Sequence, residues 1–177
     1  MSQRILVAHA SRAGSTAEVA ETIGEVLRES GSDVDVCSVK DLYSVTGYDA
    51  LVLGTAIWAG KPLPEMLKFA AAQQDAFAQK PVAYFILCDT LKEDTPRNRE
   101  IARRYLEPLL KVRQPVSLGL FAGARNFSKL HPLLRWFFMR VIRLPEGDWR
   151  DWEQIRSWAT ELAPRLAAVQ SALAAIG

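Results

Sequence analysis

Hydrophobic residues recur along the chain in two periodic patterns, and the alternation of these patterns predicts the secondary structure. Short runs rich in aliphatic and aromatic residues are typical of β-strands. Five such runs occur, at residues 4–8, 33–39, 49–55, 81–88 and 116–121. The intervening segments carry apolar residues at helical spacing or helix-boundary signals. They predict helices at residues 15–30, 64–74, 95–110 and 151–168.

The order of these elements, strand alternating with helix, predicts parallel strands joined by right-handed crossovers. We therefore expect an α/β fold in which helices cover both faces of a doubly wound, five-stranded parallel sheet. In such sheets, ligands bind beyond the carboxyl ends of the strands. The loops after the first, third, fourth and fifth strands are therefore the candidate sites.

The composition is that of a globular protein, with 49% hydrophobic and 24% charged residues among 177. One domain, residues 1–177, is expected at this length. The apolar run near the N-terminus is too short for a signal-peptide core, and no run is long enough for a membrane span. We therefore expect a cytoplasmic protein. Cys37 and Cys88 are far apart and form no CxxC motif, and with two histidines they give no zinc-site spacing, so no metal is expected.

The loop after the first strand, His9 to Thr16, combines three hydroxyls, a glycine and an arginine directly before a helix. Helix-start N–H groups and hydroxyl donors favour an anion, typically phosphate. With Gly14 as its only glycine, the loop is neither a GxGxxG turn nor a P-loop. N-capping by Ser15 or Thr16 is the alternative. Capping needs only one hydroxyl, so the whole cluster favours a phosphate site.

Two further loops follow predicted strands. In the segment Gly54–Gly60, Trp58 offers a flat face on which an aromatic ring can stack; packing of Trp58 beneath residues 62–64 is the alternative. In the segment Cys88–Lys92, Cys88 is better interpreted as a buried cysteine at the end of a strand than as a reactive thiol.

These loops resemble those of flavodoxins. Ser11–Thr16 resembles the loop that binds the FMN phosphate, and Gly54–Gly60 resembles the loop whose aromatic residue stacks on the flavin. The resemblance implies a flavodoxin-like fold with FMN, not FAD or NAD, as cofactor. Ala13 departs from the many family members that have a hydroxyl at its position, and the third loop has no aromatic residue. The implied cofactor contacts are Ser11, Arg12, Ala13, Gly14, Ser15, Thr16, Thr55, Ala56, Ile57, Trp58, Ala59, Gly60, Cys88, Asp89, Thr90 and Leu91.

Charge is distributed unevenly. Residues 108–145, the basic stretch, contain seven cations and no acid, so the rest of a chain with net charge +2 carries −5. A local partner is indicated, and nucleic acid is not favoured, because the body is acidic and no recognition motif appears.

Residues 128–144 have the spacing of an amphipathic helix, with Pro132 in its first turn. Its length of about 18 Å is too short to cross a bilayer of about 30 Å.

This helix belongs to an insertion at about residues 125–148, between the fifth strand and the last helix. Its cations and tryptophan suit an anionic membrane surface or an anionic aromatic ligand. An ordinary helix, docked on the sheet with a solvated basic face, is the alternative. The candidate substrate or membrane contacts are Arg125, Lys129, Arg135, Trp136, Arg140 and Arg143.

A flavodoxin-like core with such an insertion resembles the flavodoxin-type, quinone-dependent protoporphyrinogen IX dehydrogenases of heme biosynthesis. The similarity includes Gly54–Gly60, Gly123–Arg125, Trp136–Arg143 and Asp151–Glu153, whereas Trp58 and the shortened tail at residues 144–148 depart from the family pattern. It implies oxidation of protoporphyrinogen IX with a membrane quinone as acceptor, and peripheral contact with the inner face of the cell membrane.

Two other functions remain open. One is a flavodoxin-type electron carrier without a substrate of its own, and the other is an NAD(P)H-dependent quinone reductase. A binding module without flavin would require both loop matches to be accidental. No histidine or paired-carboxylate constellation suggests acid–base chemistry, so the catalytic residues are not assigned.

Overall fold

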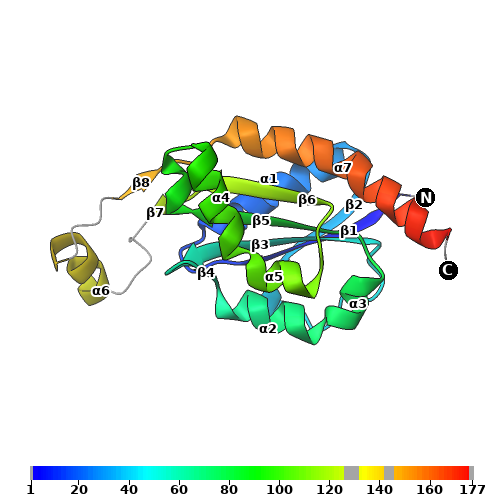
Figure 1. The fold of residues 1–177 in the computed structure, drawn as a ribbon, viewed down its shortest axis with the longest axis horizontal. Coiled ribbons are helices and arrows are strands. Elements are labelled where there is room, and N and C mark those ends of the chain that lie inside the picture. The colour runs from blue at the N-terminus through cyan, green and yellow to red at the C-terminus, as the bar shows by residue number, and fades with distance from the viewer. Residues whose placement is uncertain (1, 126–131, 142–145, 176–177) are drawn as a thin grey trace.

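A computed structural model describes residues 2–125, 132–141 and 146–175. Its main sheet has five parallel strands, as the sequence predicts (Figure 1). The strand order is β2-β1-β3-β5-β6, so the sheet grows to one side of β1 and then to the other. The carboxyl ends of β1 and β3 therefore form the crevice in which doubly wound sheets bind ligands. The strands are β1 (Arg4–Ala10), β2 (Asp33–Ser38), β3 (Ala50–Trp58), β5 (Val82–Cys88) and β6 (Ser117–Ala122).

Besides the five parallel strands the sheet contains a sixth strand, so the predicted total of five is wrong. The additional strand, β4 (Lys61–Pro62), runs antiparallel to the end of β3. The two strands are joined by Ala59 and Gly60, which both have positive φ angles, +49° and +74°. Such angles are typical of two-residue hairpin turns. The sequence did not reveal this turn because an alanine occupies a conformation that L-residues rarely adopt.

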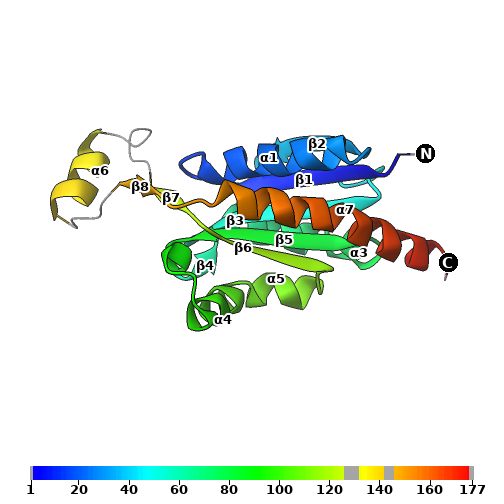
Figure 2. The same cartoon turned by 90° about the horizontal axis from the view of Figure 1, so that it is seen from above.

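Helices cover both faces of the sheet (Figures 1 and 2). One face packs against α1 (Ser15–Glu29) and α7 (Trp152–Ala174). The other packs against helices from the middle of the chain. A hydrophobic core lies on each face of the sheet, and successive residues of a strand point to opposite faces. Phe85 therefore belongs to the core beneath α1 and α7, and Tyr84 to the core on the other face. The middle elements are η1 (Val39–Asp41), α2 (Pro64–Ala72), α3 (Gln74–Ala78), η2 (Asp89–Lys92), α4 (Pro96–Tyr105) and α5 (Glu107–Val112).

Three helices differ from their predicted extents. The helix predicted at 64–74 ends at Ala72 and is followed by the short helix α3. The helix predicted at 95–110 is divided at Leu106, because Pro108 lacks an N–H group and suits the first turn of a new helix. The last helix continues to Ala174, well beyond residue 168.

The described part of the insertion projects from the carboxyl-terminal end of the sheet. Two short strands, β7 (Ala124–Arg125) and β8 (Gly147–Asp148), pair antiparallel and form its stem. Beyond them lie α6 (Pro132–Trp136) and the π-helical turn η3 (Phe137–Val141). Both views show α6 standing away from the sheet (Figures 1 and 2). The rest of the helix predicted at 128–144, including Lys129 and Arg143, lies outside the described residues.

Candidate functional site

The loop after β1 is shaped like an anion site. Gly14 is the N-cap of α1 at φ +96°, and its N–H donates to Ser11 Oγ at 3.0 Å. No side chain among the described residues caps the helix, so the predicted alternative, capping by Ser15 or Thr16, is wrong. The first N–H groups of the helix are therefore left for another acceptor.

Thr16 gives the clearest indication of what this loop could hold. Its side chain is completely buried, yet Oγ1 has no hydrogen-bond partner in the described part of the chain. An unsatisfied buried hydroxyl costs roughly 1–3 kcal/mol, so such groups usually have a partner. A phosphate oxygen would accept this hydrogen bond as well as those of the helix N–H groups. The loop residues therefore fit the phosphate of FMN.

The β3–β4 hairpin presents Trp58 beside this loop. Half of the Trp58 surface is exposed, and the Arg12 guanidinium lies 5.0 Å from the ring centroid. Arg12 thus connects the first loop to the second. Thr55 has a different role, since its buried hydroxyl accepts from the Leu63 N–H at 3.1 Å and donates to the Ala56 carbonyl at 3.0 Å. These bonds close the hairpin and hold the turn that carries Trp58.

The third loop starts at a buried cysteine. Cys88 is 3% exposed, and burial raises the pKa of its thiol to about 11, which confirms its interpretation as a buried strand-end residue. The carboxylate of Asp89 accepts from Arg125 Nε at 2.7 Å and from Arg125 Nη2, and it lies 3.7 Å from Lys92 Nζ. Leu91 is buried.

Two aromatic residues near this loop were not predicted from the sequence. The hydroxyl of Tyr105 lies 3.2 Å from Thr90 Oγ1, and a Cβ on Gly60 would be 3.4 Å from the Tyr105 ring. Tyr105 therefore lies between the hairpin turn and the third loop. The indole of Trp149 has Lys92 Nζ at 3.5 Å from its centroid and Arg125 at 5.9 Å. No local motif marks either residue, because only the tertiary fold brings them to the third loop.

Lys92 and Trp149 also line a polar cleft of about 190 Å³. This volume is below the roughly 300 Å³ of the smallest usual ligand pockets. The candidate cofactor site is therefore the surface formed by the three loops, and not this cleft.

The cations of the basic stretch that the structure describes do not form one surface. Lys111 and Arg113 lie at the end of α5, before β6, whereas Arg125 follows β6 and pairs with Asp89. The stretch is therefore divided between the two ends of that strand. In α6 and η3, Trp136 and Arg140 are exposed, while the side chain of Arg135 is outside the description.

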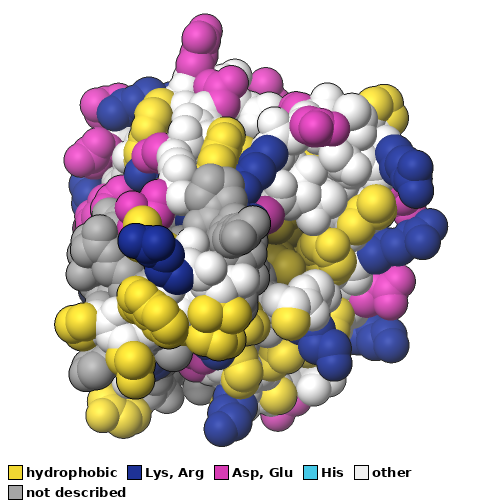
Figure 3. All heavy atoms as spheres, turned by 90° about the vertical axis from the view of Figure 1, so that its left-hand side faces the viewer, with side chains coloured by type: hydrophobic (Ala, Val, Ile, Leu, Met, Phe, Trp, Pro, Cys, Tyr) yellow, Lys and Arg dark blue, Asp and Glu magenta, His cyan; other side chains and the backbone are white. Residues whose placement is uncertain are grey.

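Five apolar residues of α6 and η3 whose side chains the structure describes form an exposed surface that we call the α6 patch. Their side chains are between 42% and 68% exposed, so this described part of the amphipathic helix is not docked on the sheet. Figure 3, which faces this end of the molecule, shows the hydrophobic side chains gathered beside cationic ones. No helix in the described ranges is long and apolar enough to cross a membrane. The α6 patch consists of Leu133, Trp136, Phe137, Met139 and Val141.

Comparison with known proteins assigns the family. Residues 6–151 match the family model described as Flavodoxin domain. The chain belongs to the flavodoxin family. Flavodoxins bind FMN, so this membership supports the predicted cofactor. The fold agrees, because this flavodoxin resembles a solved archaeal flavodoxin with a TM-score of 0.58 and 18% identity, over 93% of this chain and 99% of that one.

Two other similarities are informative. A solved flavodoxin from Streptococcus pneumoniae TIGR4 gives a TM-score of 0.55 at 17% identity, over 93% of this chain and 98% of that one. A curated relative, the protoporphyrinogen IX dehydrogenase [quinone] of Escherichia coli K12, is 22% identical over 173 residues, covering 90% of this chain and 94% of that protein. The matched span thus covers most of both chains.

Proposed function

We propose that this flavodoxin is an FMN-dependent oxidoreductase that oxidises protoporphyrinogen IX and passes the electrons to a membrane quinone. The similarity to the E. coli dehydrogenase over nearly the full length of both chains supports this function. The observation that carries it is the α6 patch, which stands at the same end of the sheet as the three candidate FMN loops. An enzyme with a lipid-soluble acceptor needs such an apolar surface, whereas a soluble electron carrier does not.

The three loops would divide the binding of FMN among them. Ser11, Thr16 and the first N–H groups of α1 would bind its phosphate. Trp58 would offer its exposed face to the ring system, and residues 88–91 would border the ring from the next strand. When bound, FMN would supply two-electron redox chemistry, and because protoporphyrinogen loses six electrons and six hydrogens in becoming protoporphyrin, three such cycles would reduce three quinones. The protein supplies binding, orientation and electrostatics.

Cations at the third loop would attract the substrate. Protoporphyrinogen carries propionate groups, and Lys92 and Arg125 both lie against Trp149 beside this loop. Asp89 pairs with each of these cations and keeps them in place. A carboxylate of the substrate could add to this cluster, and the indole provides an apolar surface for the macrocycle.

The α6 patch would give access to the quinone at the membrane. Its exposed apolar side chains and Arg140 suit the interface of an anionic bilayer, where each cation contributes roughly 1 kcal/mol. Contact of this kind is peripheral and weakens with salt, because the Debye length falls from about 10 Å at 0.1 M to about 3 Å at 1 M. We therefore propose reversible attachment to the inner face of the cell membrane.

A flavodoxin-type electron carrier is the second candidate, and the similarity of fold to solved flavodoxins favours it. Anaerobic stopped-flow mixing of the FMN-loaded protein with three reductants separates these functions. We expect protoporphyrinogen to bleach the flavin absorbance rapidly and menadione to restore it. Rapid bleaching only by a reduced ferredoxin reductase would instead identify a carrier, and rapid bleaching only by NAD(P)H would identify a quinone reductase.

A further inference from the structure

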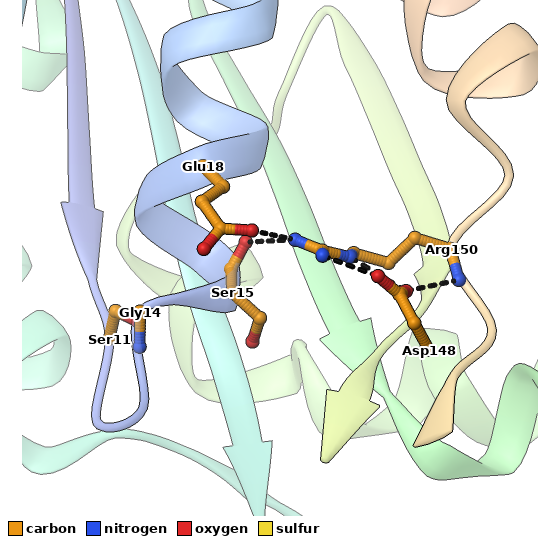
Figure 4. A network of polar contacts seen from close by, with 6 residues as sticks. All are labelled: Ser11, Gly14, Ser15, Glu18, Asp148 and Arg150. Atoms are coloured by element: carbon orange, nitrogen blue, oxygen red, sulfur yellow. Dashed lines mark hydrogen bonds and ion pairs between the residues drawn. The ribbon is translucent and has the colours of Figure 1, made fainter. Parts of the chain in front are cut away.

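Arg150 connects the stem of the insertion to the first turn of α1 (Figure 4). Its side chain is 8% exposed. Nη1 donates to Glu18 Oε2 at 2.7 Å and to the Ser15 carbonyl at 3.3 Å. Nε and Nη2 donate to the two carboxylate oxygens of Asp148 at 2.8 and 2.5 Å. The guanidinium also lies 4.6 Å from the ring centroid of Trp152.

This contact acts on the candidate phosphate loop in two ways. The hydrogen bond to the Ser15 carbonyl fixes the backbone at the start of α1, where the first N–H groups of the helix have no side-chain cap among the described residues. The ion pair with Glu18 neutralises an acid located in the first turn of α1, where its charge would repel a phosphate of charge about −1.5 to −2. The Arg150 side chain is only 8% exposed, so water screens its charge weakly, although the Glu18 side chain is 56% exposed.

We propose that Arg150 is a positioning residue for the phosphate of FMN, holding the first turn of α1 and cancelling the charge of Glu18. This inference rests on the proposed FMN site. Arg150 acts through Ser15 and Glu18 and does not itself need to touch the phosphate. Asp148 lies in β8, so this contact links the stem of the insertion to the cofactor loop. Arg150 is 135 residues away from Ser15 in sequence.

The chain offers a matched control. Arg156 in α7 pairs with Glu25 in α1 at 3.8 Å, and the Arg156 side chain is 51% exposed, whereas that of Arg150 is 8% exposed. They lie farther along both helices, away from the loop. Arg156→Gln therefore removes a cation that pairs with an acid of α1 without altering the first turn of that helix.

The test compares the dissociation constants of FMN and riboflavin, measured by flavin fluorescence quenching on the apoprotein at low salt. Riboflavin lacks the phosphate, so it reports general damage to the site. For Arg150→Gln we expect binding of FMN to weaken about tenfold or more, with riboflavin changing less than twofold. Arg150→Lys should recover part of the loss, because it keeps the charge, and Arg156→Gln should change neither constant.

Glu18→Gln keeps the inference testable if Arg150→Gln does not fold. Removing this carboxylate leaves more of the Arg150 charge uncompensated, so FMN should bind several-fold more tightly at low salt, and riboflavin should not. Equal losses for FMN and riboflavin in Arg150→Gln, or unchanged FMN binding in both variants, would overturn the inference. If the unaltered protein binds neither flavin, the proposed FMN site itself fails.

Discussion

Replacement of Thr16 by valine should separate cofactor binding from stability. Valine keeps the shape of the side chain but removes the buried hydroxyl that has no partner in the described part of the chain. If this hydroxyl donates to the phosphate of FMN, the variant loses a hydrogen bond to a charged group, worth about 1.5–3 kcal/mol. At 1.4 kcal/mol per factor of ten, the dissociation constant of FMN should rise about 10- to 150-fold. Riboflavin binding should be unchanged.

The stability of the apoprotein should change in the opposite direction. Removing an unsatisfied buried hydroxyl relieves part of a cost of about 1–3 kcal/mol, so the free energy of unfolding should rise by about 1 kcal/mol. Chemical denaturation in the absence of flavin measures this change. Thr16 is a cleaner target than Ser11, whose oxygen accepts the Gly14 N–H and supports the loop itself.

Thr55→Val provides the control for this reasoning. Thr55 is as buried as Thr16, but its hydroxyl makes two hydrogen bonds, so the substitution should destabilise the apoprotein by about 1–3 kcal/mol. An apoprotein destabilised by Thr16→Val, with unchanged affinity for FMN, would refute the reasoning, because the hydroxyl would then have a structural partner and no role at the phosphate.

Two further predictions concern the insertion and its stem. Trp136→Ser should reduce flotation of the protein with anionic liposomes at low salt. Tyr43→Ser, which removes an exposed aromatic ring outside the α6 patch, should not reduce it. Equal flotation of both variants and the unaltered protein would count against membrane contact. The hydrogen bond from Arg150 lowers the pKa of Asp148 below its ordinary value of 3.8, so the stability contributed by this carboxylate is present above that pH and is lost as the pH falls below it. Asp148→Asn should therefore be less stable than the unaltered protein at pH 7 in chemical denaturation, and the difference should shrink below pH 3.8; a constant difference would contradict this linkage.

The parallel sheet could be predicted from the sequence because each of its strands is a local pattern. Burial on both faces makes the run at Val82–Cys88 almost continuously apolar, and the order of elements then leaves few topologies. The first and second loops were also predictable, since a glycine-containing turn next to a helix and a tryptophan between glycines are local signals. Their placement at neighbouring strands β1 and β3 follows from the topology.

Features that depend on distant contacts could not be predicted. The hairpin at Ala59 requires a positive φ that alanine does not signal. Tyr105 lies on a helix, and only the fold brings it beside the turn at Gly60 and the third loop. Arg150 is likewise one arginine among many until the structure places it against Ser15. An amphipathic pattern alone also does not say whether its apolar face is docked or exposed, and in the α6 patch it is exposed.

We propose that the protein oxidises protoporphyrinogen IX through FMN and delivers the electrons to a quinone. The most direct test of this claim is the formation of protoporphyrin, followed by its fluorescence under anaerobic conditions, with menadione as acceptor. We predict sustained formation by the FMN-loaded protein, and formation at the background rate without FMN or without menadione. Formation at the background rate by the fully loaded protein, while a ferredoxin reductase still reduces its flavin, would contradict the claim and identify an electron carrier.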